Sequence, residues 1–188
     1  LLSRGAGSVR TQGALRTFDD AWEAADAIAC GEEEMIVGAL PFDHDCPAAL
    51  TVPEHIIREP GALEPHPYYR VGEGSKLSAM LIDVDPSPAE HLRRVEAAIS
   101  TIQSSALDKV VLARAVDIAF DPPVDARLVA ARLIDLSRTR DGFIADLTPA
   151  GKQGHMFVGS SPELLIKREG LKISSYPLAG SAARDFDD

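Results

Sequence analysis

Hydrophobic side chains recur at helical spacing in three stretches of the chain. In the first stretch, Thr17 with Asp20 three residues later resembles a capping box, and Gly31 follows as a stop. In the second, Ser87 can cap a helix and Pro88 suits its first turn. The pattern predicts helices over 17–30, 88–104 and 125–138.

Shorter apolar or alternating runs, bounded by Gly and Pro, predict strands. Pro53 interrupts one of these runs, and the Pro and Gly residues within 60–76 favour a loop. Helices between strands, followed by a series of hairpins, indicate an α+β fold, with a strand-rich segment over 1–76 and a second part over 77–188. The predicted strands cover 35–40, 49–57, 77–84, 109–120, 143–147, 155–158, 164–167 and 171–175.

Composition and charge narrow the class of protein. A hydrophobic share of 45% and a charged share of 26% over 188 residues are typical of a folded domain and exclude a disordered chain. The formal net charge of -10, without a cluster of Lys and Arg, argues against nucleic-acid binding. No apolar run is long enough to span a membrane, and no signal-peptide pattern is visible. Cys30 and Cys46 lack the spacing of a zinc site or a disulfide framework, so we expect a cytoplasmic protein.

Three stretches carry candidate chemistry, and the first runs over 108–114. Lys109 stands there at the start of an apolar run. Partial burial or a neighbouring cation would favour the neutral amine, which can act as a general base. A lysine that faces solvent at the start of a strand remains the alternative.

The second stretch, 159–165, places Glu163 in a tight turn before an apolar run. Partly apolar surroundings would favour the protonated carboxyl, which can act as a general acid. The third stretch, 176–184, contains small residues, and the N–H groups of Gly180 and Ser181 could bind a carboxylate. An exposed glutamate and a plain surface loop remain the alternatives for these two stretches.

Taken together and in this order, the three stretches resemble the chorismate-utilising enzymes, which include isochorismate, salicylate, anthranilate and aminodeoxychorismate synthases. Residues 108–114 resemble the strand of the general-base lysine, 159–165 the turn of the general acid, and 177–184 the substrate-binding loop. The resemblance is firm over about 77–184. It implies the N-terminal half of such an enzyme, in which 77–188 is the first, incomplete part of a catalytic domain with a two-lobed α/β sandwich.

Within this family, Lys109 resembles the members that use water as the nucleophile, and the A-G-S-A sequence around Gly180 resembles isochorismate synthases. The resemblance therefore implies an isomerase that converts chorismate to isochorismate for siderophore or menaquinone biosynthesis. Lys109 would activate water, Glu163 would protonate the leaving hydroxyl, and Gly180 and Ser181 would bind the substrate. A salicylate synthase, an amine-transferring synthase or a non-catalytic binding fragment remains the alternative.

The resemblance also implies Mg2+ as a cofactor. The family's metal-binding glutamates lie beyond the substrate loop, so we expect no metal ligand within this chain and no activity of the 188-residue segment alone. We further expect a monomer whose partner is chorismate, without binding to nucleic acid or membrane.

Overall fold

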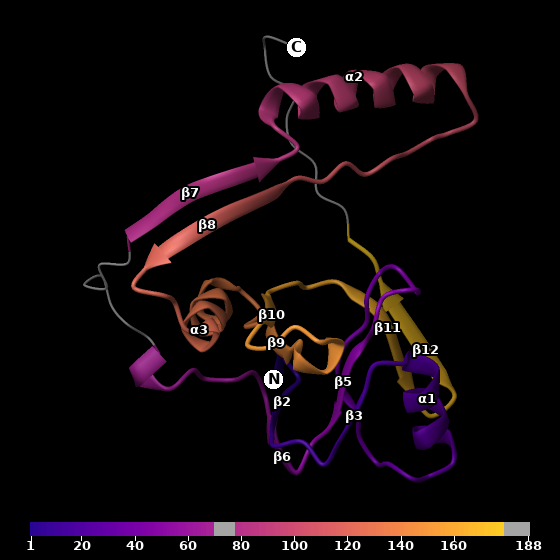
Figure 1. The fold of residues 1–188 in the computed structure, drawn as a ribbon. Helices are drawn as coiled ribbons and strands as arrows, with labels where there is room; N and C mark the ends of the chain where they lie inside the picture. The colour runs from indigo at the N-terminus through magenta and orange to yellow at the C-terminus, as the bar shows by residue number, and fades with distance from the viewer. Residues whose placement is uncertain (70–77, 179–188) are drawn as a thin grey trace. The chain divides into compact units, whose positions relative to one another are not determined.

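The computed structural model describes residues 1–69 and 78–178, which belong to two compact units (Figure 1). Unit 1 consists of Leu1–Val71 and Ala126–Asp188, and unit 2 consists of Gly72–Asp125. Helices and antiparallel strands occur in both units, which confirms the α+β class. The domain boundary after residue 76 stays a prediction, although unit 1 takes strands from both sides of it.

The larger sheet of unit 1 is antiparallel throughout and has the strand order β10-β9-β1-β2-β6. Helix α3 (Ala126–Leu136) packs on β9 and β10 and buries Ala130, Ala131 and Ile134. Gly142 permits this packing, because a Cβ atom at that position would lie 2.4 Å from Cγ1 of Ile134. The strands are β1 (Leu2–Arg4), β2 (Gly7–Gln12), β6 (His55–Pro60), β9 (Gly142–Asp146) and β10 (Met156–Gly159).

The smaller sheet of unit 1 has the order β3-β5-β4 and packs against helix α1 (Ala21–Ala29). The predicted start of this helix at Thr17 is wrong, because that residue belongs to a strand that pairs with β5. Asp20 caps the helix instead, and its carboxylate accepts hydrogen bonds from the N–H groups of Trp22 and Glu23. The core joins Phe18, Ala24, Ala27 and Val52. The strands are β3 (Arg16–Phe18), β4 (Val37–Ala39) and β5 (Ala49–Val52).

A separate two-stranded sheet completes the described part of unit 1. It pairs β11 (Leu164–Glu169) with β12 (Lys172–Tyr176), close to the predicted strands. Two short 3-10 helices occur in the connecting segments of the unit, η1 (Pro67–Tyr69) and η2 (Thr148–Ala150).

Unit 2 is a β-ribbon with a long helix in its connection. Strand β7 (Ser78–Asp85) pairs with β8 (Ala115–Asp121), and α2 (Pro88–Ser104) lies between them in sequence with the predicted bounds. The predicted strand start at Lys109 is wrong. Asp85 at the end of β7 pairs with Ala115, so the residues before 115 lie beyond the ladder and do not continue the strand.

Candidate functional site

Glu163, for which the resemblance implies the role of general acid, lies in the turn between β10 and β11. Its backbone N–H donates to Oγ of Ser161 at 3.2 Å. Its side chain is exposed, so the partly apolar surroundings expected from the sequence are not found around it in the described residues. The turn thus presents the carboxylate at the surface of unit 1.

The β11–β12 pair brings two of the three sequence motifs together. Leu164 pairs with Tyr176, so Glu163 and Leu178 lie at the same end of the hairpin. The N–H of Leu178 donates to Oε1 of Glu163 at 3.4 Å. Gly180 and Ser181 lie outside the described residues, and their role in substrate binding stays a prediction.

Packing accounts for the glycine that opens the second motif. A Cβ atom on Gly159 would lie 2.5 Å from Cζ of Phe143, on the neighbouring strand β9. That ring is itself packed against Phe157, with 5.1 Å between the ring centroids. The ring of Phe143 therefore leaves no room for a side chain at position 159, just before the turn of Glu163.

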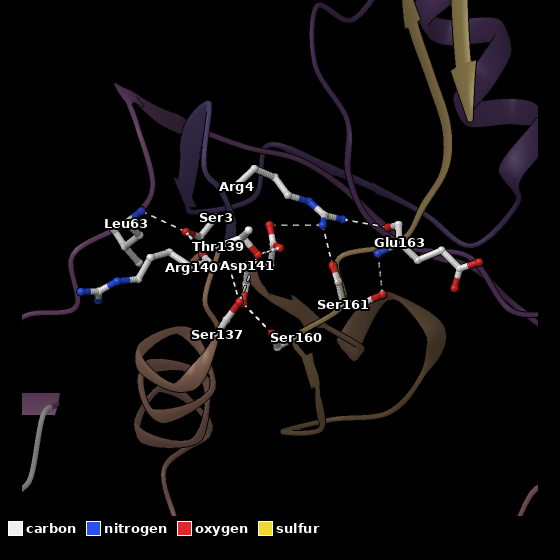
Figure 2. A network of polar contacts seen from close by, with 10 residues as sticks. All are labelled: Ser3, Arg4, Leu63, Ser137, Thr139, Arg140, Asp141, Ser160, Ser161 and Glu163. Atoms are coloured by element: carbon white, nitrogen blue, oxygen red, sulfur yellow. Dashed lines mark hydrogen bonds and ion pairs between the residues drawn. The ribbon is translucent and has the colours of Figure 1, made fainter. Parts of the chain in front are cut away.

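Arg4 of β1 contacts the same turn, as Figure 2 shows. Its guanidinium donates to the backbone carbonyl of Ser161 and, at 3.2 Å, to that of Glu163. It also forms an ion pair with Asp141, with 3.4 Å between Nη1 and Oδ1. The candidate acid is thus tied through its backbone to a residue more than one hundred positions earlier in the chain.

Asp141 is the one buried charged residue in the described part of the chain. Its carboxylate accepts a hydrogen bond from Thr139, its N–H donates to Ser137, and its carbonyl accepts from Ser160 at 2.7 Å (Figure 2). Sequence reasoning missed both Arg4 and Asp141. Their contact depends on the pairing of β1 with β9, for which no local motif gives a signal.

Lys109 lies in unit 2, within residues 105–114, which join α2 to β8 without regular secondary structure. Its side chain is exposed there. Glu163 belongs to unit 1. The pairing of the two residues across a bound ring stays a prediction.

Metal-binding geometry is absent from the residues that the structure describes, since no three His, Cys, Asp or Glu side chains are grouped to hold an ion. Cys30 and Cys46 are free and exposed. Within the same residues, no helix combines the length and the apolar character needed to cross a lipid bilayer.

Comparison with known proteins shows to which protein family the chain belongs. The family described as chorismate binding enzyme matches residues 69–188, and the chain belongs to this family. A protein of Mycobacterium tuberculosis strain H37Rv, named MenF and provisionally an isochorismate synthase, is 38% identical over 96% of this chain and 48% of its own length. The isochorismate synthase EntC of Escherichia coli K12 is 32% identical over 87% of this chain and 41% of its own length.

A solved structure gives the same result for the fold. DhbC from Bacillus anthracis, described provisionally as a 2,3-dihydroxybenzoate-specific isochorismate synthase, superposes with a TM-score of 0.74 and 25% identity. The match covers 99% of this chain and 50% of that one. The chain therefore spans about half the length of the relatives it matches.

Proposed function

We propose that the full-length protein carrying this chain is an isochorismate synthase, an isomerase acting on chorismate. One observation carries the proposal: the family match over 69–188 includes all three motifs, with Lys109, Glu163 and Gly180 in the predicted order. The MenF, EntC and DhbC relatives share the name isochorismate synthase, which favours this reaction over the other reactions of the family.

The proposed reaction consumes one water molecule and releases another. The neutral amine of Lys109 accepts a proton from water as the water oxygen bonds to ring carbon 2 of chorismate. The ring double bonds shift, and the bond between carbon 4 and its hydroxyl breaks. The protonated carboxyl of Glu163 gives its proton to that hydroxyl, which leaves as water. A base and an acid of this kind contribute roughly 10²- to 10⁴-fold each.

The contacts of Glu163 are compatible with the acid's role. The N–H of Leu178 fixes Oε1 of the carboxyl group. Within the described residues, Oε2 has no such partner and is available to a substrate hydroxyl. The backbone of Gly180 and Ser181, two and three positions after Leu178, would bind the substrate carboxylate in this proposal.

A requirement for Mg2+ is part of the proposal, although the described residues offer no site that fits the ion. No step above runs through the metal. The requirement would appear as loss of turnover in excess chelator and its return when Mg2+ is added. Turnover that persists in chelator would remove Mg2+ from the proposal.

Product analysis tests the function. The full-length protein is incubated with chorismate and Mg2+, and the products are separated by liquid chromatography and identified by mass. Isochorismate alone is the expected result. Salicylate with pyruvate, or an aromatic amine that needs ammonia, would assign another reaction of the family. If chorismate binds but is not converted, the result would support the alternative of a non-catalytic binding fragment.

A further inference from the structure

The ion pair of Arg4 and Asp141, whose side chains are 31% and 7% exposed, is not among the predicted site residues, yet Arg4 binds the turn that carries the candidate acid. We propose that this pair positions Glu163 for proton transfer. The inference rests on the proposed function, because it takes Glu163 as the general acid. Neither residue of the pair is assigned a contact with substrate, so both are positioning residues.

The hydrogen bonds from Arg4 fix both the position and the orientation of the turn. One planar guanidinium donates to two carbonyls, those of Ser161 and Glu163. Two bonds from a rigid fork restrain rotation as well as translation. Arg4 ends β1, the central strand of the five-stranded sheet, and pairs with Gly7 of β2.

Asp141 anchors the guanidinium in turn. Its side chain is 7% exposed, and a carboxylate so buried is stable only with charged or hydrogen-bonding partners. Thr139 and Arg4 supply them. Asp141 directly precedes β9, and Gly142 pairs with Ser3 of β1, so the two charges lie side by side where these adjacent strands meet the turn. A continuous series of contacts therefore runs from Asp141 through Arg4 and the turn to Glu163.

The direction of the Glu163 side chain matters for its proposed role. Figure 2 shows the carboxylate pointing away from Arg4, whose contact with this residue is to the backbone carbonyl. A guanidinium paired with the carboxylate itself would favour the ionised form, which cannot donate a proton. Holding the backbone positions the acid without this electrostatic effect on its ionisation.

The test uses the full-length protein with Arg4→Met, Arg4→Lys and Asp141→Asn, assayed for turnover of chorismate. Since a displacement of about 1 Å in a reacting group can cost roughly 10²-fold, we expect Arg4→Met and Asp141→Asn to lower kcat by about 10- to 100-fold. KM should change by less than about 3-fold, because the interaction acts on the transition state rather than on binding. Arg4→Lys keeps one donor and the charge, and should recover part of the loss.

Arg10→Met is the matched control. Arg10 lies on β2 of the same sheet and pairs with Glu59 at 2.8 Å, away from the turn. This variant should keep kcat within about 2-fold of the original, as expected for an exposed pair. Thermal unfolding of every variant identifies those that are folded. Folded Arg4→Lys and Asp141→Asn proteins with unchanged kcat would overturn the proposal, whatever happens to Arg4→Met.

A double substitution separates this inference from the proposed function. If Arg4 acts through Glu163, adding Arg4→Met to Glu163→Gln should lower the residual kcat by less than about 2-fold, since groups acting as a unit are not additive. A full additional loss would mean that Arg4 acts elsewhere. If Glu163→Gln alone keeps the original kcat, the proposed acid is wrong, and that result is independent of Arg4.

Discussion

The two units differ most in what their side chains contact. In unit 1, α1 and α3 bury apolar side chains against two sheets, and Ile134 is 1% exposed. In unit 2, no residue of α2 is buried, and Met80 and Ile118 of the β7–β8 ribbon are 64% and 50% exposed. A two-stranded ribbon without a covered face is marginally stable in water. The described unit 2 therefore has regular secondary structure without a core of its own.

The two candidate catalytic groups belong to different units, so they differ in how firmly their surroundings hold them. Glu163 follows a strand of the packed sheet and is tied by Arg4 to the centre of that sheet. Lys109 follows a helix that buries nothing, in a segment beyond the end of its ladder. The candidate acid is held in place within unit 1, whereas the described contacts of unit 2 do little to fix the candidate base. Three substitution experiments would break or sharpen this comparison, and they follow from the largest expected effect to the smallest.

The same Ile→Ala substitution should have unequal effects in the two units of the 188-residue chain. Ile134→Ala removes a buried side chain and should cost about 2–5 kcal/mol of unfolding free energy. Ile118→Ala acts at a half-exposed position and should stay within about 1 kcal/mol. Urea unfolding followed by circular dichroism measures both. Equal losses would show that unit 2 has a core comparable to that of unit 1.

Gly159→Ala should destabilise unit 1 by about 1–3 kcal/mol, because the added methyl group overlaps the ring of Phe143. Gly7→Ala in β2 is the control, since its Cβ would lie at an ordinary 3.5 Å from the carbonyl oxygen of Glu59. The same unfolding measurement applies to both variants. If the two behave alike, packing does not explain the glycine of the second motif.

The smallest effect concerns the exposed charges of α2. Hydrogen bonds from Arg93 and then Arg94 hold the pKa of Glu90 below its usual value. The resulting stabilisation is present above the pKa of the unfolded chain and is lost as the pH falls through the lower pKa of the folded state. Glu90→Gln should therefore flatten the acid side of the helicity profile slightly.

Glu96→Gln, on the same helix, is the control for that measurement, because no ion pair joins Glu96 to another described residue. Circular dichroism between pH 7 and pH 3, at low salt, measures both variants. If the helicity of Glu90→Gln depends on pH in the same way as that of the original chain, the ion pairs of Glu90 do not stabilise α2.

Local signals in the sequence predicted those elements whose ends depend on local chemistry. The Ser87 cap and Pro88 gave the start of α2, because a side-chain acceptor and a fixed φ act within one turn. The starts of α1 and β8 were wrong by four and six residues, because pairing with β5 and β7 decides them. Strand pairing joins distant residues, so local periodicity cannot place its limits.

The residues of the candidate site also divide into those that local sequence signals identified and those that they missed. Residue type and motif order identified Glu163 and the segment around Leu178, and the hairpin brings the two together. The same reasoning missed Arg4 and Asp141, because their meeting requires β1 to pair with β9 across most of the chain. An ion pair between residues so far apart in the sequence becomes visible only in three dimensions.

The proposed division of labour, with Lys109 as base and Glu163 as acid, depends on water being the incoming nucleophile. Turnover of chorismate by the full-length protein in water enriched in oxygen-18, followed by mass spectrometry, tests this directly. We predict one solvent oxygen in each isochorismate molecule, and loss of this labelled product in Lys109→Ala while chorismate binding is largely kept. Unlabelled isochorismate, or an unchanged rate of labelling in Lys109→Ala, would contradict the account.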